Sequence, residues 1–147
     1  MNFDNNANAS KNTGMPVIDE WHDFVKSRDR SSLLRLLHPD VIFESPLLHT
    51  PQHGAELTAK YLLAALNVLA IPGFKYTNEW RNDKGAVLEF HTTIEGITIN
   101  GVDIVDVNDD ATLITHFKVM VRPLKASQLL LRLMTEELAP KPQSVQG

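Results

Sequence analysis

Cysteine is missing from the chain, and neither sign of charge dominates it. Without cysteine, disulfide bonds, thiol catalysis and thiolate metal ligands are excluded. The 147 residues include 14 Lys and Arg against 18 Asp and Glu, a formal net charge of -4. Proteins that bind nucleic acid through a broad positive field have the opposite balance. We therefore expect no nucleic-acid partner.

Long apolar runs are missing as well. No stretch approaches the ~20 apolar residues that a membrane-spanning helix needs, so no membrane partner is expected. The first 16 residues, MNFDNNANASKNTGMP, are polar and lack the apolar core of a secretory signal, which favours a cytoplasmic protein. They also bury too little apolar surface to offset the entropy of ordering them. We expect a disordered tail over residues 1–16, one domain over residues 17–138 and a polar tail over residues 139–147.

The common cofactor motifs are also missing. The chain has no Gly-x-Gly-x-x-Gly fingerprint, no P-loop and no Gly-x-Ser-x-Gly turn, so we expect no cofactor and no serine-hydrolase mechanism. His49 and His53 lie four residues apart, with Glu44 and Glu56 nearby, as in some metal sites. Pro51 stands between the histidines and disfavours the helix that would align them. No metal site is expected.

The spacing of apolar residues predicts that helices come first. A helical period covers residues 17–37, where Asp29 or Ser31 caps a second, shorter helix. It returns over residues 54–69 and over residues 124–138. Between the first two helical regions, a short extended run over residues 41–45 is stopped by a proline.

Strands follow the long helix. Four runs are rich in β-branched and aromatic residues, which is typical of strands. They cover residues 74–81, 86–94, 97–107 and 112–122. Only short polar turns separate these runs, and such turns connect antiparallel neighbours. The predicted class is α+β, with helices on one face of a curved antiparallel sheet.

Asp103 is the residue that fits its surroundings least. Side chains alternate along a strand, so Asp103 faces the same side as Ile99 and Val105. A carboxylate on an apolar face is costly unless it is paired, protonated or open to a cavity. Its neighbours Val102 and Ile104 are apolar too, so both faces of this strand are expected to be covered.

Counting from the turns predicts what lies beside Asp103. A two-residue turn at residues 95–96 places Leu88 opposite Asp103, with Phe90 next on the same face. A two-residue turn at residues 109–110 places His116 opposite Asp103 on the other side. Lys118 and Met120 then share the face of His116. A slip of one residue in this second hairpin would turn His116 to the other face.

The predicted surroundings give Asp103 two interpretations. Burial raises the pKa of such a carboxyl group, and an adjacent imidazole could share its proton. The group can then donate a hydrogen bond to a developing oxyanion or act as a general acid or base. The alternative is structural, with Asp103 and His116 forming a satisfied buried polar pair. The sequence leaves both open.

Three features carry a resemblance to a known family. They are PDVIFESPLLHTPQHG before the long helix, GVDIVDVNDDATLITHFKVMVRP in the last hairpin, and Trp21 on the first helix. With the order of elements, they resemble the SnoaL-like branch of the nuclear transport factor 2-like superfamily over residues 18–138. The resemblance implies a cystatin-like cone, a curved antiparallel sheet wrapped around helices, with an extra C-terminal helix. It also implies a pocket for a small apolar ligand and a homodimer through the convex sheet face.

Members of this superfamily include ketosteroid isomerases, polyketide cyclases and non-catalytic binding domains, so the fold does not fix the function. By the resemblance, Asp103 falls on the protonated aspartic acid of ketosteroid isomerase, which helps to bind the oxyanion. The general-base aspartate falls on Ser45, and the oxyanion-hole tyrosine falls on Trp21. Neither a serine hydroxyl nor an indole can do the same job, so steroid isomerisation by that mechanism is not expected. Polyketide cyclases use an acid in the pocket, a part that Asp103 could play.

The candidate ligand-binding residues come from the helices and from several strands. They are Trp21, Phe24, Phe43, Ser45, Tyr61, Leu88, Phe90, Lys118 and Met120. For the aromatic ones, the alternative is ordinary core packing. Two functions stay open. One is a cofactor-independent isomerase, cyclase, dehydratase or hydrolase in which Asp103 and His116 move a proton on a carbonyl or polycyclic substrate. The other is a non-catalytic module for ligand binding or dimerisation.

The opposite face of the strands is predicted to be too apolar to face water. Its predicted residues are Val87, Val102, Ile104, Phe117, Val119 and Val121. We therefore expect a homodimer that covers this face.

Overall fold

The computed structural model describes residues 15–140 of the chain. The helices are α2 (Pro16–Ser27), α3 (Arg30–Leu36), α4 (Ala55–Leu69) and α5 (Leu124–Leu138). The strands are β1 (Leu37–Glu44), β2 (Gln52–His53), β3 (Lys75–Asn82), β4 (Gly85–Ile94), β5 (Ile97–Val107) and β6 (Ile114–Arg122). Most of both expected tails, residues 1–14 and 141–147, lies outside the described residues.

The folded part begins earlier than the sequence indicated. Met15 is buried, and Pro16 opens α2, where a helix needs no backbone N–H from it. Asp29 is the N-cap of α3, and its carboxylate accepts a hydrogen bond from the backbone N–H of Ser32 at 3.1 Å. Of the two predicted caps, Asp29 is therefore the one that is used. The chain then enters β1 directly at Leu37, ahead of the predicted extended run.

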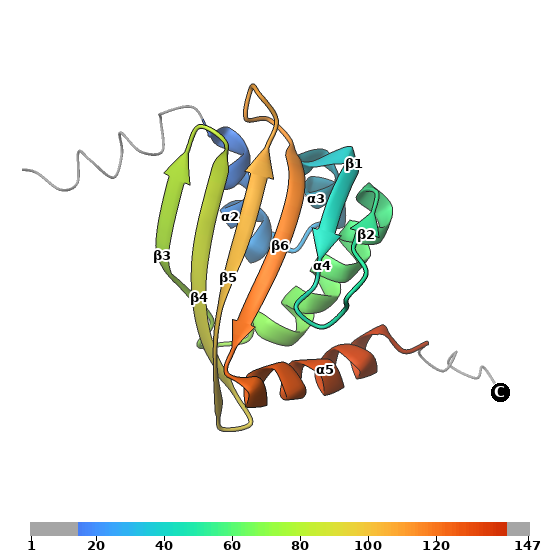
Figure 1. Ribbon diagram of the computed structural model, residues 1–147, viewed down its shortest axis with the longest axis vertical. Coiled ribbons are helices and arrows are strands. Elements are labelled where there is room, and N and C mark those ends of the chain that lie inside the picture. Colours follow the sequence, from blue (N-terminus) through green and yellow to red (C-terminus); the bar gives the residue numbers. More distant parts are fainter. Residues whose placement is uncertain (1–14, 141–147) are drawn as a thin grey trace, which may run out of the picture.

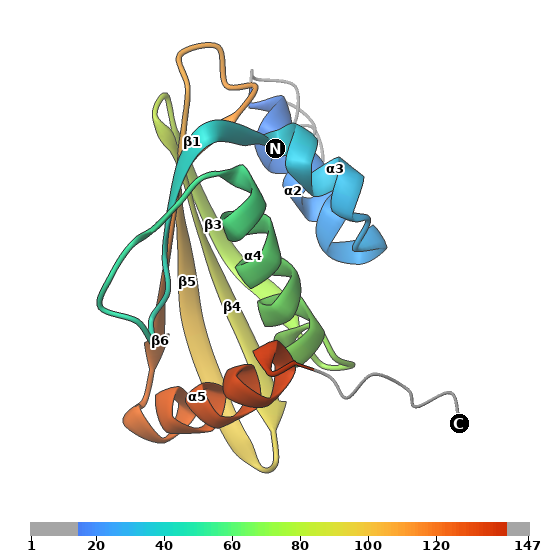
Figure 2. The same cartoon turned by 90° about the vertical axis from the view of Figure 1, so that its right-hand side faces the viewer.

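The six strands form one curved sheet in the order β2-β1-β6-β5-β4-β3 (Figure 1). Strands β3 to β6 are an antiparallel meander, as their short turns predicted. Strand β1 pairs in parallel with β6, and β2 adds a short antiparallel edge; neither pairing was predicted. Helices α2, α3 and α4 lie on one face of the sheet, and α5 crosses its end (Figure 2). The predicted α+β class with a C-terminal helix is confirmed.

The register between β4 and β5 is the predicted one. Leu88 lies opposite Asp103, and Phe90 follows on the same face. Glu95 and Gly96 form the two-residue turn, with φ angles of 52° and 77°. Positive φ at both central residues is what the tightest hairpin turns require, because it matches the twist of the strands.

The predicted register between β5 and β6 is wrong by three residues. Asp103 pairs with Val119, whereas His116 pairs with Asp106. Because side chains alternate along a strand, a slip by an odd number turns every side chain to the other face. His116 lies on the outer sheet face, where its Nε2 is 2.6 Å from Oε2 of Glu44. It is not the partner of Asp103.

The slip arises because the connection is a loop rather than a two-residue turn. The side chain of Asn108 accepts hydrogen bonds from the backbone N–H groups of Thr112 and Leu113, at 2.9 and 3.0 Å. Ala111 adopts a positive φ of 58° within the same loop. Residues 108–113 therefore all belong to the connection, and β6 begins two residues later than predicted.

The same correction applies to the other residues of β6. Lys118 and Met120 lie on the outer face, and Met120 is 51% exposed. Phe117, Val119 and Val121 face inward, toward the helices. The outer face is therefore less apolar than predicted, although Val87, Val102 and Ile104 remain on it.

The core fills the space between the inner sheet face and the helices. Trp21 of α2 lies at its centre, with its ring 4.8 Å from that of Phe117 and 5.3 Å from that of Phe24. A second cluster joins Phe90 to Leu129 and Leu130 of α5, so the C-terminal helix is packed onto the sheet. Within residues 15–140, no helix combines the length and the apolar character needed to cross a bilayer.

Candidate functional site

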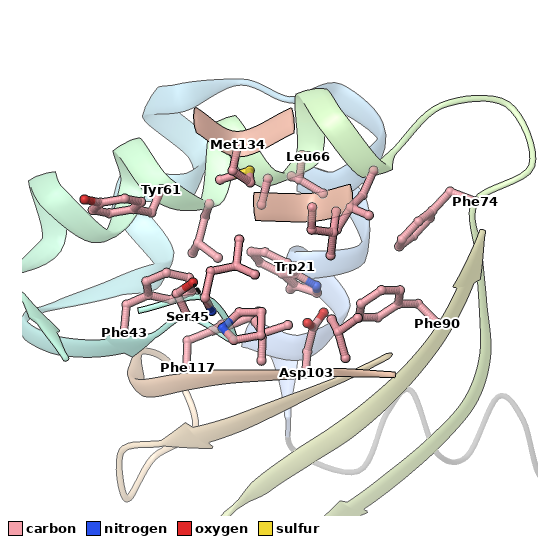
Figure 3. Close-up of a pocket in the computed structure, with 18 of the residues that line it drawn as sticks. Trp21, Phe43, Ser45, Tyr61, Leu66, Phe74, Phe90, Asp103, Phe117 and Met134 are labelled. Carbon is pink, nitrogen blue, oxygen red and sulfur yellow. Dashed lines mark hydrogen bonds between the residues drawn. The ribbon is translucent and has the colours of Figure 1, made fainter. Parts of the chain in front are cut away.

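A cavity of about 60 Å³ lies between the inner sheet face, α4 and α5 (Figure 3). Its wall is almost entirely apolar and includes Phe43, Leu66, Phe90, Phe117 and Met134. A single water needs ~10–15 Å³, so the cavity has room for several waters or for a small apolar ligand in their place.

Asp103 is the only carboxylate on the cavity wall among the residues that the structure describes. It stands on the inner face of β5, points toward Trp21 with Phe90 at its side (Figure 3), and is 6% exposed. Burial raises the pKa of Asp103 from 3.8 to about 7, and a hydrogen bond from Tyr76 opposes this rise to a smaller extent. Both the protonated and the ionised form are therefore populated at neutral pH.

Tyr76 of β3 contacts Asp103 directly. Its O–H donates a hydrogen bond to Oδ2 of Asp103 at 2.7 Å, and its oxygen accepts one from the indole N–H of Trp21 at 3.1 Å. Burial of the hydroxyl raises the pKa of Tyr76 well above its ordinary value, and the charge of Asp103 raises it further. The phenol is therefore neutral and acts as a hydrogen-bond donor.

A β-bulge in β3 brings Tyr76 to this position. The register between β3 and β4 shifts between Tyr76 and Asn78, which places Tyr76 opposite Phe90 on the inner face. A ladder that continued regularly from the turn would place Thr77 there and turn Tyr76 outward. The bulge thus positions Tyr76, which makes the one side-chain hydrogen bond to Asp103 found in residues 15–140.

A cluster of polar and charged side chains lies beside Tyr76, outside the cavity lining. The ring of His22 stands edge-on to Tyr76, with 5.2 Å between ring centroids, and its Nε2 is 2.6 Å from Oε1 of Glu79. Arg81 contacts Glu79 as well, and it donates to Asp19 at 2.8 Å. None of the four side chains of this cluster lines the cavity.

The structure brings six of the predicted site residues to the cavity wall. They are Trp21, Phe43, Ser45, Tyr61, Phe90 and Asp103. Phe24 and Leu88 are fully buried but do not line the cavity, because the core covers them on all sides. His116, Lys118 and Met120 lie on the outer face for the reason given above. None of these five residues lines this cavity.

The sequence interpretation missed Tyr76, Phe74 and Met134. Tyr76 lies inside a predicted strand, but no local pattern marks the bulge that turns it inward. Met134 had a usable signal: it follows Leu130 by four residues, so the two share one face of the predicted helix, and both line the cavity.

The site offers one acid for proton exchange in an apolar environment. No group of three or more His, Asp or Glu side chains in residues 15–140 is arranged to hold a metal ion. A buried carboxyl group whose pKa lies near neutrality can accept or donate a proton, and nearby apolar walls exclude the competing water.

Comparisons with known proteins agree with this architecture. Residues 18–116 match the SnoaL-like domain family. The chain is similar to a steroid delta-isomerase from Pseudomonas aeruginosa, with 35% identity, a TM-score of 0.77, and coverage of 84% of this chain and 89% of that one. It is also similar to a protein with a cystatin-like fold from Silicibacter pomeroyi DSS-3, with 28% identity, a TM-score of 0.76, and coverage of 84% and 86%. No curated protein matches the chain. The expected cystatin-like fold is confirmed.

Proposed function

The chain belongs to the SnoaL-like domain family of the nuclear transport factor 2-like superfamily, and we propose that it is a cofactor-independent enzyme for a small apolar carbonyl compound. In this proposal the compound occupies the cavity, and Asp103 exchanges a proton with it. His116 has no part in the reaction, because it lies on the outer sheet face beside Glu44.

One observation carries the proposal, a single carboxyl group on the wall of an apolar cavity. Burying a carboxyl group is costly, and strongly perturbed acids of this kind gather at functional sites. Burial raises the pKa of Asp103 to about 7, and proton transfer is most efficient when the pKa of the catalytic group lies near the working pH. The similarity to a steroid delta-isomerase supports an isomerisation as the reaction.

The proposed reaction needs one group to take a proton and to return it. Ionised Asp103 removes a proton from the carbon beside the carbonyl group. The C–H electron pair becomes part of a C=C bond while the carbonyl π pair moves to oxygen, which gives an enolate. Protonated Asp103 then returns its proton to the same or another carbon, and the carbonyl group re-forms. The net result is hydrogen exchange or isomerisation, with the carboxylate regenerated.

Hydrogen–deuterium exchange on simple ketones tests the proposal. Cyclohexanone and 2-tetralone are incubated with the protein in D₂O, and loss of the α-proton signals is followed by NMR. Wild type is expected to exceed the buffer rate, and Asp103→Asn to lose the excess. Asp106→Asn is the matched control, because Asp106 is an exposed carboxylate on the outer face of the same strand. Exchange that survives Asp103→Asn would overturn the proposal.

Non-catalytic ligand binding is the second candidate, and one observation favours it. The position that the family resemblance assigns to a general base is Ser45, whose Oγ accepts a hydrogen bond from the backbone N–H of Leu47 at 3.0 Å. Asp103 is the one carboxyl group on the described part of the cavity wall, so no second carboxylate there can act as a general base. Ketones that shift the NMR signals of cavity residues without exchanging faster than in buffer would identify this function.

A further inference from the structure

We infer that Trp21 and Tyr76 form a chain of two hydrogen bonds, both donated toward Asp103, which favours its ionised, proton-accepting form. Trp21 is a positioning residue, because it acts on Asp103 through Tyr76. The inference rests on the proposed function. The chain runs from the indole N–H of Trp21 to the Tyr76 oxygen, over 3.1 Å, and from the Tyr76 O–H to Oδ2 of Asp103, over 2.7 Å. It joins α2, β3 and β5, three elements that are distant in the sequence.

The direction of the chain follows from the chemistry of the indole. The Nε1 of Trp21 carries a hydrogen and can only donate. The Tyr76 oxygen therefore accepts from Trp21, and its single proton is left for another acceptor, which is Asp103. A carboxylate is an acceptor at both oxygens, whereas a proton on Oδ2 would compete with the proton of Tyr76. The chain therefore favours ionised Asp103. This is the form that the first step of the proposed reaction needs, because in that step Asp103 removes a proton from the ligand.

Packing holds both donors in place before a ligand arrives. Trp21 is 2% exposed, with its ring against those of Phe24 and Phe117. The ring of Tyr76 meets that of Phe74 edge-on, with 5.2 Å between centroids. Donors that are already oriented need no reorganisation when charge moves, which is the condition under which a hydrogen bond contributes most to a reaction.

Few other titratable groups face this chain. His22 stands edge-on to Tyr76 on the side away from the cavity, bonded to Glu79, which Arg81 also contacts. On the cavity side, Tyr61 of α4 is the one titratable group besides Tyr76 and Asp103 among the residues described; the lining residues from α5, β4 and β6 are uncharged. His22 is therefore the neighbouring group whose influence on the signals an experiment must separate from that of Asp103.

The chain can be observed directly because the protein has two tryptophans, Trp21 and Trp80. A ¹⁵N–¹H spectrum of the wild type contains one indole signal from each. We expect the Trp21 signal to shift with pH at the same midpoint as the side-chain carboxyl carbon of Asp103. The Trp80 signal is the internal control, because Trp80 is 57% exposed and lies on the outer face of β3. The measurement needs no ligand.

Variants identify each link of the chain. Tyr76→Phe is expected to uncouple the Trp21 signal from Asp103 and to raise the Asp103 midpoint by about one pH unit, because the carboxylate loses a hydrogen bond. Trp21→Phe is expected to raise the midpoint by less. Tyr61→Phe removes a phenol from the same cavity that makes no hydrogen bond to Asp103, and it should leave the midpoint unchanged. In His22→Gln the Trp21 signal should still follow Asp103.

A Trp21 signal that stays constant while Asp103 titrates would overturn the inference, and so would one that loses its pH dependence in His22→Gln. If Tyr76→Phe fails to fold, the wild-type and His22→Gln spectra decide the matter. In exchange assays, Trp21→Phe should shift the pH profile of the rate to higher pH, together with the Asp103 midpoint. An equal loss of rate at every pH would show that Trp21 has a merely structural role. If the proposed function is wrong but this inference is right, the result is different: the indole signal of Trp21 follows Asp103, while ketone exchange never exceeds the buffer rate.

Discussion

Replacing Asp103 by asparagine should stabilise the protein at high pH and change its stability little at low pH. Burial raises the pKa of Asp103 from 3.8 to about 7, so the folded state binds this proton more tightly than the unfolded chain does. The proton therefore stabilises the fold. Its contribution is fully present below about pH 3.8 and is lost as the pH rises through about 7.

The size of the effect follows from the same difference. About three pH units correspond to ~4 kcal/mol, at roughly 1.4 kcal/mol for each unit. Asp103 is only 6% exposed, so solvent screens this cost weakly. The value is a large part of the ~5–15 kcal/mol by which domains of this size are stable. Asparagine avoids the cost, because it carries no charge and keeps an oxygen that can accept the hydrogen bond from Tyr76.

Urea unfolding of the wild type and Asp103→Asn over a range of pH measures the effect. We expect the two free energies of unfolding to be similar near pH 4 and to separate by up to ~4 kcal/mol above pH 8, with the variant more stable. Asp106→Asn should follow the wild-type curve. A difference between wild type and Asp103→Asn that is the same at every pH would refute the reasoning, because Asp103 would then not be a desolvated acid.

Three further outcomes are expected. Leu88 is fully buried, so Leu88→Ala should lower the free energy of unfolding by ~2–5 kcal/mol, whereas Leu131→Ala, at a residue that is 51% exposed, should change it little. Gly101→Ala would place a Cβ 2.3 Å from Cζ of Phe90 and 2.8 Å from the carbonyl oxygen of Met120, so urea unfolding should show a loss of ~1–3 kcal/mol; an unchanged value would contradict the packing described. We also propose a homodimer across the outer sheet face, with a mass by light scattering of twice 16.5 kDa that Ile104→Asp reduces to the monomer; a stable wild-type monomer would contradict it.

The β4–β5 and β5–β6 hairpins show when counting residues from a turn predicts the strand register correctly. The turn at Glu95 and Gly96 has the two residues that its sequence suggests, so Leu88 was correctly predicted beside Asp103. Residues 108–113 also contain polar residues typical of a short turn. The Asn108 side chain, however, accepts hydrogen bonds from two backbone N–H groups and stabilises a longer loop. Since the resulting slip is odd, it turned over every side chain of β6 and removed His116 from the site.

The sequence predicts which sheet face Asp103 lies on but not which face Tyr76 lies on. Asp103 was predictable because its strand is regular, so alternation with Ile99 and Val105 fixes its face. Tyr76 was not predictable, because an irregularity in β3 decides its face, and bulges depend on the fit between neighbouring strands. The parallel pairing of β1 with β6 escaped prediction for a related reason: it joins segments about seventy-five residues apart, which no local pattern records.

The most direct test of the site is the pH titration of the Asp103 carboxyl carbon by ¹³C NMR, with the signal assigned by its absence from the spectrum of Asp103→Asn. We predict a midpoint of about 7. A midpoint near 3.8, the ordinary value, would show a solvated carboxylate and would contradict the claim that Asp103 is an acid held on the wall of an apolar cavity.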